Sequence, residues 1–463
     1  MEAVLQRSPL PLTPEVPFPM PLSTCPDPAL PAPRPAPALR RLLSLGAVTV
    51  LLATGCGQAS GALAGEPAAP ASSSSTSPSS TSPSSTSPSS TSPPSTSPPS
   101  TGRPATAAPA EVAVAPADAA VEHNPVEPVV VRADRGELTD VVLVPAPGGD
   151  PVPGELSADG RTWTSTEVLD FDTPYELHWS ATSGAVSTTG TSTFTTVLAA
   201  NEVDARLNVV DGGVYGTGQV LQFTFSEPVA NKEQVEEAVT VDGGGDRAGA
   251  FRWYSDTMVR YRPAEKWAPR AEITVSLDLL GLDVGHGMVG NHDLRRSFST
   301  GAEHYARVDN GTKTLTAYVD GKVAGTYPVT LGNADWPSTT GQKVIMEQAP
   351  EYLFTASSLD LQPGDPHWYE TFWASNVSRL TASGEFVHQA LPSAMPVLGI
   401  ANVSHGCVGM PPEGAKFIHD VFRPGDVVEV VGTGYPQADP DDGFGDWNIP
   451  LEHYADEDWQ GDW

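Results

Sequence analysis

Residues 385–417, EFVHQALPSAMPVLGIANVSHGCVGMPPEGAKF, place a lone cysteine, Cys407, in a small and polar neighbourhood. His405 and Gly406 precede it directly, and His388 lies upstream in FVHQA, a pattern typical of a strand. PPEGAKFIHDVF favours a helix, because prolines stand at its start. Its apolar residues fall on one helical face, and these are Phe417, Ile418, Val421 and Phe422. The stretch therefore predicts a histidine-bearing strand, a cysteine-containing turn and one main helix.

The surroundings of Cys407 favour chemistry over packing. A lone cysteine in an exported domain is usually an apolar core filler, but Ser404, His405, Gly406 and Gly409 are not core surroundings. A thiolate is a nucleophile, and a nearby imidazole lowers the thiol pKa or accepts its proton. His388 could do this from a neighbouring strand, while backbone amides near Cys407 could hold a developing oxyanion. Together these groups suffice for acyl transfer.

Two metal sites are weaker alternatives. His388, His405 and Cys407 are three plausible ligands, but no fourth ligand is evident in the sequence. His286 and His292 in GHGMVGNH are spaced only loosely for a metal, and no third ligand is near them. We interpret the latter pair as loop histidines.

The predicted domain around Cys407 spans residues 301–433 and is rich in β-structure. TLTAYVDGKVAGTYPVTLG predicts a hairpin with Asp320 and Gly321 in its tight turn. VVEVVG after the helix predicts a closing strand.

Two β-sandwiches are predicted before this domain, at residues 124–199 and 200–300. Short alternating segments separated by turns, such as YELHWSAT and STFTTV, indicate the first sandwich. In VLQFTFS, Leu221, Phe223 and Phe225 alternate with polar residues, as a half-buried strand requires. SEPVANKEQVEEAVTV is compatible with one short helix. The predicted fold class is therefore mainly β and multidomain.

SHGC preceded by a strand histidine resembles the L,D-transpeptidase family of cell-wall enzymes. The segments GEFVHQA, NVSHGCVGM, AKFIHDVFRPGDVVEVVGT and GFGDWNIP are all similar to actinobacterial members, which carry immunoglobulin-like domains before the catalytic one. The resemblance covers roughly residues 124–455. It implies two immunoglobulin-like sandwiches followed by an L,D-transpeptidase catalytic domain.

The resemblance also implies roles for individual residues. Cys407 would be the nucleophile and His388 the general base, oriented by the backbone carbonyl of Gln389. The amides of Gly406 and Cys407 would form the oxyanion hole, while Ser404 and His405 complete the motif. Tyr369 and Trp373 fall where relatives have a lid over the donor site, and ordinary packing is an equal alternative for both. The candidate substrate-binding residues are Tyr369, Trp373, Gln389 and Asn402.

The activity implied by the resemblance is cross-linking of peptidoglycan stem peptides, which act as donor and acceptor. The donor's third, diamino-acid residue would be acylated onto Cys407, and a side-chain amine of another stem would take it. No metal or organic cofactor is implied, and carbapenems are expected inhibitors. A thiol L,D-carboxypeptidase or hydrolase and a non-catalytic cell-wall-binding lipoprotein remain alternatives, although an intact Cys–His pair argues against the binder.

The N-terminal part predicts export and anchoring. Residues 1–56 read as a leader, in which Arg40 and Arg41 precede an apolar run too short to span a bilayer. The run ends in ATGC and resembles a bacterial lipoprotein signal, with Cys56 as the lipidated residue. An ordinary secretory signal is the alternative. Residues 57–123 include repeated STSPSS and STSPPS, which predict a disordered stalk above the outer face of the membrane.

The tail and the overall charge are both acidic. Residues 434–463 are predicted to be an acidic extension in which 443–455 docks on another domain, because aromatic residues seldom belong to disordered segments. The final ADEDWQGDW is expected to stay solvated. The formal net charge of −31 argues against a nucleic-acid partner.

Overall fold

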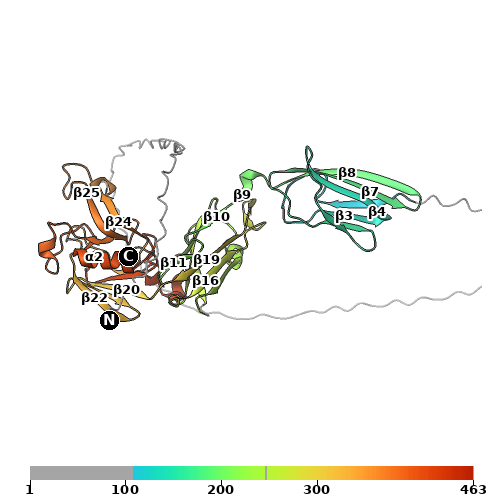
Figure 1. The fold of residues 1–463 in the computed structure, drawn as a ribbon. Helices are drawn as coiled ribbons and strands as arrows, with labels where there is room; N and C mark the ends of the chain where they lie inside the picture. The colour runs from blue at the N-terminus through green and yellow to red at the C-terminus, as the bar shows by residue number, and fades with distance from the viewer. Residues whose placement is uncertain (1–107, 246–247, 360, 462) are drawn as a thin grey trace, which may run out of the picture. The chain divides into compact units, whose positions relative to one another are not determined.

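The structure is a computed structural model that describes residues 108–245, 248–359, 361–461 and 463. The predicted leader with Cys56 and the Ser/Thr/Pro repeats lie outside these residues. The predicted mainly β, multidomain architecture is confirmed, with successive β-rich regions running from cyan to red in Figure 1. Among the residues that the structure describes, none of the helices combines the length and apolarity needed to cross a bilayer.

The first sandwich packs two four-stranded sheets around one core. One sheet has the order β1 (Glu111–Ala115), β3 (Val130–Arg135), β6 (Thr162–Ser165), β5 (Gly154–Leu156). The other has the order β2 (Ala120–His123), β8 (Val186–Thr196), β7 (Pro174–Ser183), β4 (Glu137–Pro145).

The stalk predicted to run to residue 123 is too long, because β1 and β2 lie within it. Val112 and Val114 alternate with exposed residues along β1 and pack against the sandwich core. This strand is short and follows a proline-rich segment, so its period-two pattern is hard to distinguish from the end of the repeats.

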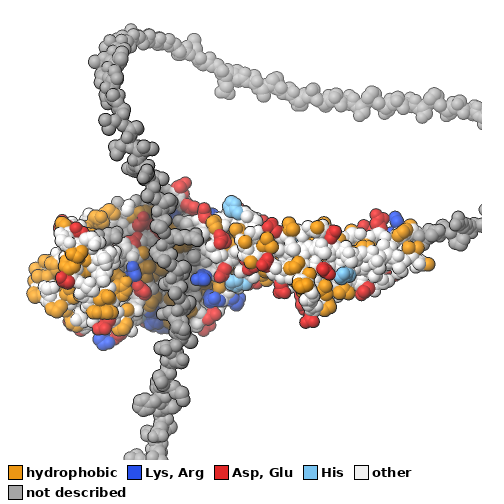
Figure 2. All heavy atoms as spheres, turned by 90° about the horizontal axis from the view of Figure 1, so that it is seen from above, with side chains coloured by type: hydrophobic (Ala, Val, Ile, Leu, Met, Phe, Trp, Pro, Cys, Tyr) orange, Lys and Arg blue, Asp and Glu red, His pale blue; other side chains and the backbone are white. Residues whose placement is uncertain are grey.

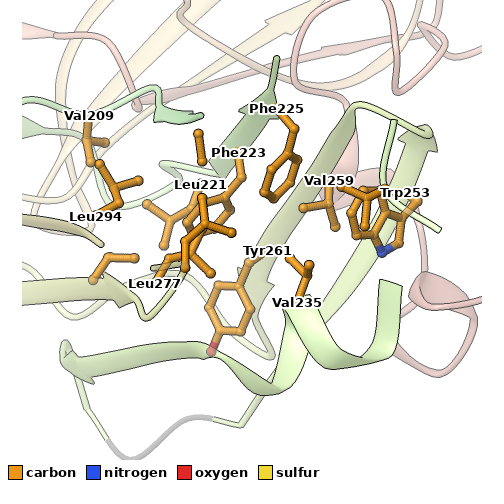
Figure 3. Close-up of a cluster of buried hydrophobic side chains, with 14 of the residues drawn as sticks. Val209, Leu221, Phe223, Phe225, Val235, Trp253, Val259, Tyr261, Leu277 and Leu294 are labelled. Atoms are coloured by element: carbon orange, nitrogen blue, oxygen red, sulfur yellow. The ribbon is translucent and has the colours of Figure 1, made fainter. Parts of the chain in front are cut away.

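The second sandwich also has two four-stranded sheets. One sheet has the order β10 (Ala205–Leu207), β12 (Leu221–Phe225), β15 (Met258–Pro263), β14 (Gly249–Ser255). The other has the order β11 (Gly213–Tyr215), β19 (Leu294–Thr300), β16 (Glu272–Leu277), β13 (Val239–Gly243). A small sheet joins β17 (Asp283–Gly285), β18 (Met288–Gly290) and β9 (Glu202–Val203), and the short segments η1 (Ala199–Asn201) and α1 (Lys232–Glu237) complete the region. Leu221, Phe223 and Phe225 are buried as predicted, and Figure 3 shows them in the cluster that also contains Leu277.

The region around Cys407 contains two sheets. The five-stranded sheet has the order β22 (Lys322–Pro328), β21 (Thr314–Val319), β20 (His304–Asp309), β28 (Val427–Val431), β23 (Gly341–Val344). The four-stranded sheet has the order β24 (Glu347–Phe354), β25 (Phe372–Arg379), β26 (Phe386–Gln389), β27 (Val408–Met410). Helix α2 (Pro412–Val421) and the 3-10 segments η2 (Ala356–Leu359) and η3 (Met395–Val397) lie between strands in the chain.

The predicted elements of this region are present. Asp320 and Gly321 join β21 to β22 with φ values of 48° and 71°, the left-handed conformations that a tight two-residue hairpin turn needs. Ile418 on α2 packs into one core with Val387 of β26 and Val408 of β27. The helix therefore braces the two short strands that flank the candidate site.

The C-terminal tail folds back as η4 (Asp446–Asn448) and α3 (Leu451–Tyr454). Ile449 and Tyr454 are fully buried, and the Trp447 indole donates to the Gly218 carbonyl of the second sandwich at 2.8 Å. The side chains of Asp456, Glu457 and Asp458 are exposed as expected, but the backbone there is held, since Arg252 donates to the Glu457 carbonyl at 3.2 Å. Acidic side chains are spread over the face shown in Figure 2.

Candidate active site

Cys407 and His388 come together through a parallel strand pair. Cys407 directly precedes β27, which pairs with β26 so that Val387 lies opposite Val408 and His388 opposite Gly409. Cys407 and His388 are both buried, and both line one cavity of about 540 Å³. The strand pairing thus brings two residues distant in sequence to the same wall, as acyl transfer by a Cys–His pair requires.

The His388 ring is held in one tautomer. Its Nδ1 lies 2.7 Å from the Gln389 carbonyl oxygen, which can only accept, so Nδ1 carries the proton and Nε2 is the free acceptor. Burial lowers the pKa of His388 below its ordinary value, although the bond to Gln389 opposes this. The ring also packs against Phe354, with centroids 5.4 Å apart. A neutral imidazole with a free Nε2 is suited to accept a proton.

The Cys407 thiol rests in an apolar setting. It belongs to a small cluster with Phe354 and Phe386, and it donates weakly to the Gly384 carbonyl oxygen at 3.6 Å. Burial raises the thiol pKa to about 12. The resting site therefore holds a thiol and a neutral imidazole rather than an ion pair. The thiol would lose its proton in the step in which sulfur attacks.

Hydroxyl groups fix the loop before Cys407. Ser404 Oγ donates to the Cys407 carbonyl at 2.6 Å, and Ser338 Oγ donates to the Gly406 carbonyl at the same distance. Gly406 has a φ of 110°, a conformation that side-chain-bearing residues rarely adopt. These contacts hold the peptide units on both sides of the nucleophile.

His405 points to a different group of residues. Its Nε2 donates to the His367 carbonyl at 3.1 Å, and its ring lies 5.9 Å from that of Trp336 and 5.3 Å from that of Tyr369. Within the described ranges, no group of three or more His, Cys, Asp or Glu residues could hold a metal ion. Neither the set His388, His405 and Cys407 nor the pair His286 and His292 forms part of such a group in the described residues.

Of the four predicted substrate-binding residues, one lines the cavity and three do not. Tyr369 lines the cavity, and its hydroxyl donates to the Thr355 carbonyl at 3.0 Å. Gln389 contributes its carbonyl to His388, but its side chain is not part of the lining. Trp373 is 62% exposed and outside the lining.

Asn402 also lies outside the lining. Its side chain donates to Asn310 Oδ1 at 2.8 Å and accepts from the Leu331 amide at 3.3 Å. Asn402 therefore braces the loop before Ser404, and its predicted contact with substrate is not supported by its position.

Sequence reasoning missed the aromatic wall of the cavity. Tyr352 and Phe354 on β24 and Phe372 on β25 line it, with the rings of Phe354 and Phe372 stacked at 5.3 Å. The alternation in EYLF was the available signal, because residues two apart on a strand share a face. Ser338, which donates to the Gly406 carbonyl, was also missed, and no local pattern marks it.

Two family models match the chain. The model described as the L,D-transpeptidase catalytic domain matches residues 303–430, and the model described as a bacterial Ig domain matches residues 120–283. The chain is 33% identical over 339 residues to L,D-transpeptidase 2 of Mycobacterium tuberculosis. This match covers 73% of this chain and 82% of that protein. L,D-transpeptidase 5 of the same species is 28% identical over 350 residues, with coverages of 73% and 75%.

A solved structure is also similar. It is L,D-transpeptidase 3 from Mycobacterium tuberculosis in complex with a faropenem-derived adduct, at 25% identity and a TM-score of 0.42, covering 49% of this chain and 97% of that one. The sequence matches to the catalytic and bacterial Ig domains and to L,D-transpeptidase 2 show that this chain belongs to the L,D-transpeptidases, a cysteine-dependent transferase family that acts on cell-wall peptidoglycan.

Proposed function

We propose that the protein joins two peptidoglycan stem peptides through a thioester on Cys407. Sγ attacks the carbonyl carbon of the donor's third, diamino-acid residue while His388 Nε2 takes the thiol proton. The amides of Gly406 and Cys407 stabilise the oxyanion. When the C–N bond to the terminal D-alanine breaks, His388 returns its proton to the leaving amine.

The second half of the reaction uses the same groups. A side-chain amine of an acceptor stem attacks the thioester carbon, and His388 takes a proton from the attacking nitrogen. Collapse of the intermediate breaks the C–S bond, and the proton passes to the Cys407 sulfur. The product links two third-position diamino acids, and the enzyme returns to its resting state.

One observation carries this proposal. His388 Nδ1 is committed to the Gln389 carbonyl, which leaves Nε2 as the proton acceptor, and His388 and Cys407 line the same cavity. Cys407 is also the free cysteine among the residues that the structure describes. A carbapenem offers a reactive carbonyl to the same nucleophile, so we propose that this class of β-lactam acylates Cys407.

The test measures intact mass and products. Incubation of the purified chain with a carbapenem should add the mass of the drug, and Cys407→Ala should abolish this addition. An adduct that persists in the variant would refute the nucleophile. With tetrapeptide stems, a cross-linked dimer supports transpeptidation, whereas a free tripeptide alone would identify the hydrolase.

We propose further that lipid on Cys56 anchors the enzyme to the outer face of the membrane, with residues 57–107 as a spacer. Support comes from the ATGC end of the apolar run and from a substrate that lies outside the cytoplasm. Cys56→Ala should release the protein to the medium or leave an uncleaved precursor. Normal processing and membrane retention of this variant would contradict the anchor.

A further inference from the structure

A buried ion pair lies behind the nucleophile loop. Lys343 on β23 and Glu385, which directly precedes β26, are both buried, and Lys343 Nζ contacts Glu385 Oε2 directly. The Cγ atom of Glu385 lies 3.5 Å from where a Cβ on Gly406 would stand. Burial of two charges costs free energy that their attraction seldom exceeds, so stability alone is a weak reason for such a pair.

Both members of the pair converge on Thr339. Glu385 Oε1 accepts from the Thr339 backbone amide at 2.7 Å and from its hydroxyl at 2.9 Å. Lys343 Nζ donates to the Thr339 carbonyl at 2.7 Å. Three polar groups of Thr339 are thus bound by one ion pair, which leaves this residue a single orientation.

The neighbouring residue transmits this orientation to the loop. Ser338 is fully buried, accepts from the Gly332 amide at 3.0 Å and donates to the Gly406 carbonyl at 2.6 Å. That carbonyl belongs to the same peptide unit as the Cys407 amide. Because a trans peptide is planar and its C=O and N–H point in opposite directions, fixing the carbonyl also fixes the direction of the Cys407 N–H.

We propose that Lys343 and Glu385 are positioning residues, which act through Thr339 and Ser338 to aim the Cys407 amide at the oxyanion. This inference rests on the proposed function, because it needs acyl transfer at Cys407. The contacts form a continuous path from the ion pair to the peptide unit that the reaction uses. An oxyanion hole depends on such fixed donors, since a donor that must reorient in the transition state stabilises it less.

A direct electrostatic effect on the thiol is the competing explanation. Burial dominates the raised pKa of Cys407, and the two charges then act in opposite directions, with Glu385 raising the pKa and Lys343 lowering it. Because the two charges oppose each other, removing both should not slow alkylation of the thiol. Acylation and simple alkylation separate the two explanations, because only acylation forms an oxyanion.

The experiment compares the full chain with four variants: Ser338→Ala, Lys343→Met/Glu385→Gln, the triple combination of these, and Val428→Ala. Each is assayed for acylation by a carbapenem and for alkylation of Cys407 by iodoacetamide. Alkylation is measured on the peptide that contains Cys407, because Cys25 and Cys56 also react with this reagent. Val428 is buried opposite Lys343 on β28 and serves as the stability control. We expect acylation to slow about 100-fold in Ser338→Ala and about tenfold in the pair variant, with alkylation unchanged in both.

The triple variant should acylate no more slowly than Ser338→Ala, because links in one path are not additive. The proposal would be overturned if the fold-losses of acylation in Ser338→Ala and in the pair variant multiplied in the triple variant. It would also be overturned if alkylation fell in parallel with acylation, or if Val428→Ala lost acylation to the same extent. If the pair variant does not fold, Thr339→Ala tests the same link by removing one bond to Glu385. It should slow acylation without changing alkylation, and an unchanged rate would contradict the path. Failure of the unmodified chain to react with the carbapenem would instead refute the proposed function.

Discussion

Single residues in this site owe their properties to their immediate neighbours. The Gln389 carbonyl leaves His388 Nε2 as the acceptor, and burial favours the neutral ring. Thr330 and Gly409 both line the cavity, and a Cβ added to Gly409 would lie 3.0 Å from Thr330 Cγ2. A side chain at position 409 would therefore press against the Thr330 side chain, which would have to shift by a few tenths of an ångström.

The pH dependence of acylation follows from the His388 ring. Its folded-state pKa is lower than the ordinary value of about 6.5, so the neutral base persists as the pH falls through that value. Carbapenem acylation measured from pH 4 to pH 8 should therefore decline only below about 6.5. His388→Gln should slow acylation about 100-fold or more at pH 7.

A matched control is His178→Gln, whose half-exposed side chain lies in the first sandwich. That variant should keep the rate and pH profile of the unmodified protein. A midpoint above the ordinary histidine pKa would show that the ring is stabilised in its charged form and would contradict this assignment.

At the scale of elements, the site depends on the connection into β27. The strand pair β26–β27 is short, and α2 packs against it through Ile418. Gly406 is the residue that turns the chain into β27, with its left-handed φ of 110°. The turn is also where the proposed oxyanion donors lie, so its geometry should affect catalysis more than stability.

Gly406→Ala tests this relation. A Cβ at this φ costs about 1–2 kcal/mol of backbone strain, and relief of that strain would rotate the adjoining amides. We expect acylation to slow at least about tenfold while the protein stays folded. Gly148→Ala is the control, because Gly148 has a φ of 120°, has open space around it and lies in the connection between β4 and β5 of the first sandwich. Equal rates in both variants would show that the turn tolerates rotation.

At the scale of the whole molecule, the tail ties the second sandwich to the catalytic domain. Asp446 is completely buried, accepts from Arg260 at 3.1 Å and from the Tyr454 hydroxyl at 2.7 Å. Asn448 binds both backbone groups of Gln342 in the catalytic domain. The tail thus contributes polar contacts to both sides of this junction.

Asp446→Ala should destabilise the junction strongly. Loss of the carboxylate leaves the buried Arg260 guanidinium without its main partner, which costs about 3–5 kcal/mol. Asp441→Ala removes a second carboxylate from the same arginine, but that side chain is 58% exposed at 3.8 Å, so its loss should cost at most about 1 kcal/mol. Chemical denaturation followed by tryptophan fluorescence would compare the two, and equal midpoint shifts would argue against the buried network.

Much of the architecture and the chemistry was predictable because the signals are local. Alternation in VLQFTFS places Leu221 and Phe223 in a core, and a tight hairpin selects residues such as Asp320 and Gly321 at its turn. The motif around Cys407 indicates acyl transfer, since thiol, imidazole and glycine-rich backbone have few other joint uses. The first two inferences need only residues within one element or one turn, whereas the third also needs His388 from a neighbouring strand.

Only the tertiary structure decided which side chains face the cavity and which brace it. Ser338 meets Gly406 and Lys343 meets Glu385 across long sequence separations, so no short pattern marks either contact. Asn402 is close to the motif in sequence, but its side chain donates to Asn310 Oδ1, because a side chain's direction depends on its spatial neighbours. Local propensity and periodicity determine elements from sequence, whereas contacts between distant elements depend on how the sheets pack.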